Sequence, residues 1–366
     1  MLTTYPPTVC GLATFGASLS NGLEANGSEV NVVRVADGAP STDARVVGEL
    51  TNGSAQSIAA CASLLNQYDV AVIQHDFGIY GGPDGGDVAD VMRALTVPSI
   101  VVVHAVPRHP TARQRSILEA IVALADRLVV MSDTAAERLR TGYVVDRHKI
   151  SNITHGATIP RAVATKRGGR PTLLTWGLLG PGKGVERVID AMGSLHELRG
   201  QPRYLVAGPT HPKVLAAEGE AYREARIEQV QRKGLAGSVS FEANYRSPGV
   251  LAQLVQSCAV VVLPYDANDQ ITSGVLVDAI ASGRPVVATA FPHAIELLGS
   301  GAGIVVGHDD PDGLVLAVRR ILSDPRVAGD MAAEGRRLAP TLAWPTVAKS
   351  YVTLAQRILI DRRART

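Results

Sequence analysis

Short apolar runs alternate with amphipathic stretches along most of the chain. The runs contain few polar positions, which is typical of strands buried on both faces of a parallel sheet. In the first half they predict strands at Val30–Arg34, Val70–Gln74, Ser99–His104, Arg127–Met131 and Ile150–Ile153. Helical spacing predicts helices at Gly11–Asn26, Ser54–Tyr68, Asp87–Ala94, Ala112–Ala125 and Thr134–Gly142. A first strand before Pro6 is either very short or begins upstream.

A second series follows the first. Its strands are expected at Thr172–Trp176, Arg203–Ala207, Val239–Phe241, Ala259–Leu263, Val286–Ala288 and Gly303–Val306. Its helices are expected at Gly184–Leu198, Gly219–Lys233, Pro248–Ser257, Gly274–Ala281, Ile295–Gly299 and Pro311–Leu322. This alternation predicts an α/β fold with two doubly wound, parallel-sheet, Rossmann-like domains. The polar stretch Arg161–Arg170 is the expected join. Ligands of open α/β sheets bind at the carboxyl ends of strands, so we expect a site in a cleft between the domains.

Composition narrows the classes of function. The 366 residues suffice for two domains, and 36 basic against 34 acidic residues argue against a dedicated nucleic-acid binder. Three widely spaced cysteines fit a reducing cytoplasm rather than a disulfide framework or a zinc cluster. No apolar run is long enough to span a membrane. We interpret the basic tail Arg357–Arg365 as a solvated helix end, with weak peripheral contact with the inner face of a membrane as the alternative.

Candidate site residues follow predicted strands in the first half. Gly11, at the start of the first helix, would let the backbone approach a phosphate or simply form a tight turn. His75 and Asp76 end a strand and lead, with Tyr80, into a glycine-rich loop that could contact or close over a hydroxylated ligand. His104 ends another strand, where it is either a ligand contact or a hydrogen-bonded strand terminator.

The stretch Gly177–Gly184 is the strongest phosphate-binding signal in the second half. It connects a predicted strand to a helix and contains Gly182 and Lys183. The spacing does not match a Walker loop or G-x-G-x-x-G. Glycine-rich backbone with one lysine at a helix start is nevertheless suited to hold a diphosphate without a metal ion.

A second polar stretch stands ahead of the helix predicted at Gly274–Ala281. Here Thr272 or Ser273 could cap the helix. Alternatively, the helix N-terminus could hold an anion, since its first N–H groups lack intrahelical partners. The residues concerned are Gln270, Thr272, Ser273, Gly274 and Val275, and Asp278 one turn later could accept ribose hydroxyls.

Together these signals indicate an enzyme that binds a nucleoside diphosphate and stabilises it as a leaving group. Negative charge grows on the diphosphate as its bond to a sugar breaks, and Lys183 with the helix N-terminus would stabilise that charge most in the transition state. The sequence has no Asp-x-Asp cluster after a strand, so we expect neither a metal nor another cofactor.

The chain resembles the retaining, bacterial family-four glycosyltransferases of the GT-B fold. The resemblance covers nearly the whole length and rests on Tyr5–Thr14, Gly177–Gly184, Leu263-Pro264-Tyr265 and Gln270–Gly283. It implies an acceptor-side domain at 1–163 and a nucleotide-sugar donor domain at 164–340. It also implies that a C-terminal helix within 341–366 packs back on the first domain. That helix is expected at Thr346–Arg362, with Val347, Tyr351, Leu354 and Ile358 on one face.

The resemblance also assigns roles and marks departures. It implies that Gln270 holds hydroxyls of the donor sugar, that Asp278 contacts the ribose and that His104 lies beside the transferred sugar. The family usually has Glu where Gln270 and Asp278 stand, and an Arg near Leu178. We expect either that Arg246 or Arg108 substitutes for that cation or that the donor binds more weakly. The chain is closest to bacterial members that share the loop after Gln74 and the Thr210-His211-Pro212 segment.

Two other functions share the same donor pocket. One is a GT-B nucleotide-sugar 2-epimerase, although that reaction normally places more carboxylates near the sugar. The other is a non-catalytic protein that binds nucleotide sugars or glycans. We favour transfer of a hexose from a guanosine or uridine diphosphate sugar, GDP-mannose first, to a glycan, glycolipid or small-molecule acceptor. The sequence does not predict the acceptor or the oligomeric state.

Overall fold

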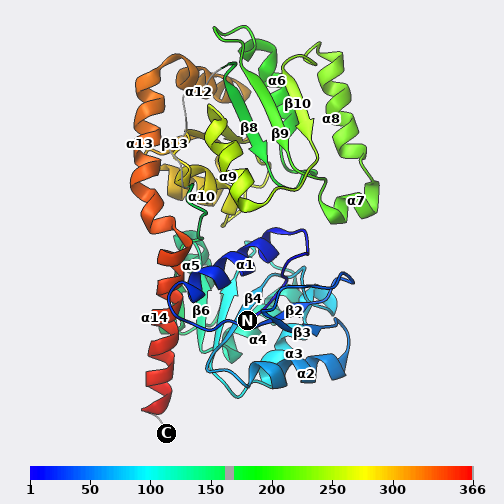
Figure 1. The fold of residues 1–366 in the computed structure, drawn as a ribbon, viewed down its shortest axis with the longest axis vertical. Coiled ribbons are helices and arrows are strands. Elements are labelled where there is room, and N and C mark those ends of the chain that lie inside the picture. The colour runs from blue at the N-terminus through cyan, green and yellow to red at the C-terminus, as the bar shows by residue number, and fades with distance from the viewer. Residues whose placement is uncertain (161–168, 365–366) are drawn as a thin grey trace. The chain divides into compact units, whose positions relative to one another are not determined.

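A computed structural model of the protein describes residues 1–160 and 169–364. The chain folds into two compact units (Figure 1). One contains Met1–Gly156 together with the C-terminal helix from Trp344, and the other contains Ala157–Ala343. The boundary expected between residues 163 and 164, within the stretch Arg161–Arg170, lies outside the described residues. Each unit is a parallel sheet covered by helices, as the alternating pattern predicted.

The N-terminal unit has the strand order β3-β2-β1-β4-β5-β6-β7, with all pairs parallel. Its strands are β1 Leu2–Thr3, β2 Val32–Val35, β3 Val46–Leu50, β4 Ala71–His75, β5 Ser99–Val103, β6 Arg127–Val130 and β7 Ile150–Asn152. Its helices are α1 Gly11–Glu24, α2 Ala55–Leu65, α3 Asp87–Arg93, α4 Ala112–Leu124, α5 Asp133–Gly142 and the later α14, with short 3₁₀ turns at Pro83–Gly85 and Arg147–Lys149.

Sequence analysis missed β3. This edge strand has alternating half-buried and exposed residues over most of its length, unlike the unbroken apolar runs that mark the central strands. The strand before Pro6 is present but has only two residues, Leu2 and Thr3, which pair with β2 and β4.

The C-terminal unit has the strand order β10-β9-β8-β11-β12-β13, again parallel. Its strands are β8 Thr172–Trp176, β9 Arg203–Ala207, β10 Val239–Glu242, β11 Val260–Leu263, β12 Val286–Thr289 and β13 Gly303–Val306. Its helices are α6 Val185–Leu195, α7 Pro212–Glu218, α8 Ala221–Arg232, α9 Pro248–Ser257, α10 Gly274–Ala281, α11 Pro292–Leu298, α12 Pro311–Ser323 and α13 Pro325–Leu342.

Helices α7 and α13 were not predicted. The sequence of α13 contains Gly329, Gly335 and Pro340, which lower helix propensity. Packing overrides that preference, because α13 lies against α10 so closely that a Cβ atom on Gly335 would come within 2.6 Å of the Ile280 carbonyl oxygen. The glycine that weakens the helix therefore allows its closest contact.

The C-terminal helix, α14, runs from Trp344 to Arg363 and packs on α1 (Figure 1). Val347, Tyr351, Leu354 and Ile358 lie in one hydrophobic core with residues of α1. A Cβ atom on Gly22 of α1 would be 2.8 Å from the Trp344 carbonyl oxygen, so the two helices approach closely there. The predicted return of this helix to the first domain is confirmed, and the helix begins at Trp344 rather than Thr346.

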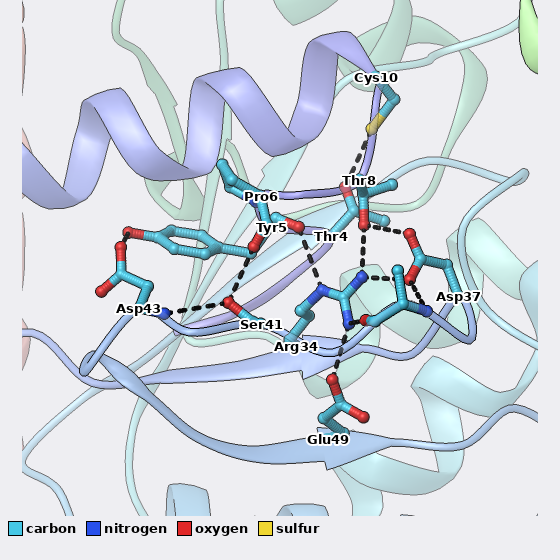
Figure 2. A network of polar contacts seen from close by, with 11 residues as sticks. Thr4, Tyr5, Pro6, Thr8, Cys10, Arg34, Asp37, Ser41, Asp43 and Glu49 are labelled. Atoms are coloured by element: carbon cyan, nitrogen blue, oxygen red, sulfur yellow. Dashed lines mark hydrogen bonds and ion pairs between the residues drawn. The ribbon is translucent and has the colours of Figure 1, made fainter.

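Arg34 organises the start of the N-terminal unit (Figure 2). Its side chain is fully buried, yet each guanidinium nitrogen has partners. They are the carbonyl oxygens of Tyr5 (3.1 Å) and Ala39 (2.6 Å), the Thr8 hydroxyl (2.9 Å), and the carboxylates of Glu49 (2.7 Å) and Asp37. One cation thus ties the loop before α1 to β2, β3 and the turn between them, with its charge balanced by two carboxylates.

Candidate functional site

The loop Gly177–Gly184 leaves the carboxyl end of β8 and enters α6, as predicted. Three of its glycines have positive φ, at +117° for Gly177, +87° for Gly182 and +63° for Gly184. A Cβ atom on Gly184 would lie 1.8 Å from the Pro264 carbonyl oxygen, so only glycine fits there. A Cβ atom on Gly182, by contrast, would meet no atom within 4 Å. The loop is therefore packed at its end and open beside Lys183.

Lys183 lies over an aromatic ring. Its Nζ is 4.5 Å from the centre of the Tyr265 ring, in the geometry of a cation–π contact. The side chain is half-buried. Burial lowers the pKa of Lys183 to about 8. The residue is thus a cation at neutral pH that is short of compensating negative charge, which favours binding of an anion.

Ser273 caps α10. Its hydroxyl accepts a hydrogen bond from the Leu276 N–H at 3.2 Å, so the capping interpretation holds for this residue. The next residues, Gly274 and Val275, occupy the first two helical positions, where N–H groups have no intrahelical partner. The hydroxyl of Thr272 is buried without a hydrogen-bond partner among the described residues. Capping and anion binding therefore do not exclude each other here.

These two loops lie side by side. A Cβ atom on Gly177 would be 3.9 Å from Cγ2 of Val275. The Gly182 carbonyl oxygen also accepts a hydrogen bond from the Asp266 N–H at 2.9 Å, which links the lysine loop to the segment after β11. The structure thus brings Lys183 and the N-terminus of α10 to one region of the C-terminal unit, as the diphosphate interpretation requires.

Asp278 and Gln270 flank this region and are both half-buried. Asp278 accepts a hydrogen bond from the Thr158 N–H at 3.2 Å, and burial raises its pKa to about 7. The predicted contact of Asp278 with a ribose stays a prediction. The Gln270 side-chain amide donates a hydrogen bond to the Thr272 carbonyl oxygen at 3.0 Å, which closes a small ring within the loop.

The surroundings of Leu178 bear on the missing arginine. Leu178 and Lys183 line the same small hollow at the end of β8. The expected substitute Arg246 forms an ion pair with Glu242. His211 is adjacent to the lysine loop in space, because Thr210, the residue before it, pairs with Leu179 of that loop. Burial, and then the charges of Lys213 and Lys183, lower its pKa, so His211 is a neutral neighbour of Lys183.

In the N-terminal unit the candidate histidines are uncharged, and His75 is buried whereas His104 is half-buried. Burial lowers the pKa of His75 to about 4 and that of His104 to about 3. His155, which sequence analysis did not single out, has a pKa of about 4 for the same reason. The ring of His104 hydrogen-bonds to the side chain of Gln74 and meets Phe15 edge-on at 4.8 Å. At neutral pH these side chains are hydrogen-bonding groups, not cations.

The loop after His75 is anchored at several points. Tyr80 is buried, and its hydroxyl donates to the Gln74 carbonyl oxygen at 2.7 Å. Asp76 accepts from the Gly78 N–H at 2.9 Å, and Asp87 accepts from the Gly53 N–H at 2.7 Å. Both ring nitrogens of His75 lack a hydrogen-bond partner among the described residues. These contacts hold the loop against β4 and the segment at Gly53, and its closure over a ligand stays a prediction.

Gly11 is the first residue of α1, and Cys10 caps that helix by accepting from the Ala13 N–H at 3.3 Å. A Cβ atom on Gly11 would meet no atom within 4 Å. The space that the sequence interpretation required is therefore present.

Sequence analysis assigned no role to two further side chains of the C-terminal site. They are Tyr265, which was named only within the Leu263-Pro264-Tyr265 motif, and His293. Tyr265 follows β11 and carries Lys183, while His293 follows β12 and contacts the loop before α10. The rule that selected His104, a polar residue just after a buried strand, would also have selected His293.

Neither a membrane span nor a metal centre is evident in the described part of the chain. No helix within residues 1–160 and 169–364 has the length and apolar character needed to cross a membrane. Over the same residues, no three His, Cys, Asp or Glu side chains gather as metal ligands. Metal-independent activity remains a prediction.

Comparison with known proteins supports the resemblance to glycosyltransferases. Residues 170–324 match the family model described as glycosyl transferases group 1, and this range contains both donor-side loops. The C-terminal unit is thus similar to the group 1 glycosyltransferases. The two parallel-sheet units of the chain have the GT-B architecture, which confirms the fold class that the sequence predicted.

The curated relatives that this chain matches are bacterial. It is 29% identical over 262 residues to D-inositol 3-phosphate glycosyltransferase of Corynebacterium urealyticum, a match covering 68% of this chain and 60% of that protein. It is 30% identical over 181 residues to GDP-mannose:glycolipid 4-beta-D-mannosyltransferase of Xanthomonas campestris, covering 48% and 45%. The chain thus spans about half the length of the curated relatives it matches.

Solved structures share the fold at low identity. Anabaena Alr3699/HepE, crystallised with UDP and glucose, has a TM-score of 0.77 at 16% identity, covering 97% of this chain and 99% of that one. Sucrose-phosphate synthase from Thermosynechococcus elongatus has a TM-score of 0.75 at 18% identity, covering 95% and 94%.

Proposed function

We propose that this protein is a glycosyltransferase that transfers a hexose from a nucleoside-diphosphate sugar to a glycan, glycolipid or small-molecule acceptor. In this proposal the anomeric configuration is retained and no divalent metal takes part. The observation that carries the proposal is the juxtaposition of Lys183 with the N-terminus of α10 through the Gly177–Val275 contact. Lys183 offers a poorly compensated cation, and α10 offers free N–H groups beside it.

The proposed mechanism follows from where charge develops. As the bond between sugar and diphosphate breaks, the leaving diphosphate gains negative charge. The Lys183 ammonium and the N–H groups of Gly274 and Val275 would stabilise that charge more strongly in the transition state than in the ground state. His104, neutral at the carboxyl end of β5, would accept or donate a hydrogen bond at a sugar hydroxyl rather than supply charge.

The nature of the donor and acceptor is a finer proposal. One relative is named for GDP-mannose and a glycolipid, and another for inositol 3-phosphate. These names support a hexose donor, with GDP-mannose as the first candidate, and an acceptor rich in hydroxyl groups. We propose a cytoplasmic site of action, in line with three free cysteines, and leave weak contact with a membrane surface as part of the proposal.

A two-stage experiment tests this function. First, GDP, UDP, ADP and their hexose conjugates are compared by thermal shift, because a ligand that binds only the folded state raises Tm. Second, the binding donor is incubated with a panel of glycan, glycolipid and inositol acceptors, with and without chelator. NMR of the product reports the anomeric configuration.

Each outcome has a distinct meaning. Transfer with retention, unaffected by chelator, supports the proposal. An epimerised sugar with free nucleoside diphosphate would instead indicate an epimerase, and tight donor binding without turnover on any acceptor would indicate a binding protein. Loss of transfer with chelator and its return with Mg²⁺ or Mn²⁺ would overturn the metal-independent mechanism.

A further inference from the structure

The start of α11 contacts both donor-side loops. It includes the N-cap residue Phe291 and His293, which are both fully buried. Phe291 stacks on Tyr265, with ring centres 5.5 Å apart and an interplanar angle of 25°. The Lys183 ammonium lies over the Tyr265 ring. The start of α11 therefore supports the lysine loop through the stacked rings of Phe291 and Tyr265.

His293 supports the other loop directly. Its Nδ1 accepts a hydrogen bond from the Ser273 N–H at 2.9 Å. Its own backbone N–H donates to the Gln270 carbonyl oxygen at 3.3 Å. One residue thus holds the loop at both ends, and the Gln270 side chain braces the middle through the Thr272 carbonyl oxygen.

The chemistry of this contact makes the histidine specific. Ser273 is buried, so its N–H group needs an acceptor, and a buried N–H group without one is costly. Only an unprotonated ring nitrogen accepts a hydrogen bond. The contact therefore requires the tautomer that keeps its proton on Nε2. An apolar residue of similar size would fill the space but leave the Ser273 N–H unpaired.

On the strength of these contacts, we propose that His293 is a positioning residue for donor binding, which fixes the residues before α10 so that the Gly274 and Val275 N–H groups point at the donor phosphate. This inference rests on the proposed function and adds a residue that touches no substrate. The Ser273 hydroxyl caps α10, but His293 determines where that cap stands.

The test uses three variants of the full chain. His293→Leu removes the acceptor, and His293→Asn retains one, because the Asn side-chain oxygen can occupy the position of Nδ1. Asp324→Ala is the matched control. It removes an N-cap in the same unit, that of α13, whose oxygen accepts from the Arg326 N–H at 2.9 Å. His293→Leu and Asp324→Ala are expected to lower Tm by similar amounts.

Donor kinetics separate positioning from simple stabilisation. At a temperature where all variants are folded, His293→Leu should lower kcat/KM for the donor at least 10-fold, with the acceptor KM unchanged. Asp324→Ala should stay within twofold of wild type, and His293→Asn should recover most of the loss. Donor kcat/KM within twofold of wild type in folded His293→Leu would overturn the proposal.

Hydrogen exchange tests the clamp without reference to activity. In His293→Leu, the amides of residues 270–277 should exchange at least 10-fold faster, while Asp324→Ala should leave them unchanged. Unchanged exchange in His293→Leu would refute the clamp even in an active enzyme. A wild-type protein that neither binds nor uses any donor of the panel would instead refute the proposed function, and with it the donor role of this loop.

Discussion

The two units place candidate residues by the same rule but prepare them differently. In both, polar side chains follow the carboxyl ends of parallel strands. In the N-terminal unit they are neutral histidines, exemplified by the half-buried His104, which hydrogen-bonds to Gln74. In the C-terminal unit burial lowers the pKa of Lys183 and raises that of Asp278, so both charges lack full compensation. The first N–H groups of α10 also lack intrahelical partners. A site suited to bind an anion has positive groups without negative partners before the anion binds. A site suited to contact a neutral ligand needs only uncharged hydrogen-bonding groups.

This difference predicts opposite responses of the two units to acid, and that is the largest effect we expect. His75, His104 and His155 have folded-state pKa values of about 4, 3 and 4, below the usual value of 6.5. The unfolded N-terminal unit therefore binds more protons between these values, so its stability is present above pH 6.5 and is lost as pH falls. By the same linkage, each histidine lowers the free energy of unfolding by about 2 kcal/mol at pH 5 relative to pH above 6.5.

The two tryptophans of the chain allow the units to be measured separately. Trp344 belongs to the N-terminal unit and Trp176 to the C-terminal unit. Urea unfolding of Trp176→Phe and Trp344→Phe proteins, followed by fluorescence at pH 7 and pH 5, should show the Trp344 transition moving to lower urea at pH 5. The Trp176 transition should move slightly to higher urea, because the raised pKa of Asp278 makes the C-terminal unit more stable as pH falls. Equal shifts would contradict the contrast between the units.

Removing the cation of the C-terminal site should have the next largest effect. Lys183→Ala is expected to lower kcat/KM by roughly 10- to 1000-fold, because a charged contact to a buried anion contributes about 1.5–3 kcal/mol and more as the leaving group departs. The fold should survive, since burial disfavours the Lys183 charge rather than stabilising the unit. Circular dichroism and steady-state donor kinetics measure the two parts, and wild-type kinetics in a folded variant would return the loop before α10 to a purely capping role.

A pH profile sharpens the same point. With a free-enzyme pKa of about 8, Lys183 loses its proton as pH rises through 8, and kcat/KM should fall there. Since bound diphosphate favours the ammonium, kcat should fall only at higher pH. Lys183→Arg should remove the alkaline fall in kcat/KM because a guanidinium stays charged throughout this range.

Arg34 provides a structural counterpart in the N-terminal unit. Arg34→Met leaves the carbonyl oxygens of Tyr5 and Ala39 without their donor and two carboxylates without their cation (Figure 2). We expect about 2–3 kcal/mol of destabilisation, seen only in the Trp344 transition. Arg337→Met is the control, because the Arg337–Glu334 pair is exposed and its loss should change neither transition measurably.

The sequence predicted the parts of this fold that depend on unbroken patterns. Central strands such as β8 and β9 were placed to the residue, because they are buried on both faces. Edge strand β3 and the glycine-containing helix α13 were missed, since tertiary packing rather than local pattern determines them. In the site, Lys183 and Ser273 were visible as motif residues. The supporting roles of Tyr265 and His293 were not predicted, because these roles depend on contacts with residues far away in sequence.

Asp278→Asn should have the smallest effect on stability, and one of unusual sign. Burial raises the folded-state pKa of Asp278 to about 7, so the folded protein binds its proton more tightly than the unfolded chain. Stability therefore falls as pH rises from about 4 to 7, and the ionised carboxylate destabilises the unit above pH 7. Asn carries no charge, and its side-chain oxygen can still accept from the Thr158 N–H. Because the site is partly open to solvent, we expect a gain of only about 1 kcal/mol at pH 8, or roughly 2–4 °C in Tm, and none at pH 4. The donor KM should rise several-fold, since a carboxylate accepts two ribose hydroxyls better than an amide does. Thermal unfolding at the two pH values, with donor kinetics at pH 8, measures both changes. A variant less stable than wild type at pH 8 would show that the Asp278 carboxylate supports the fold rather than the ligand.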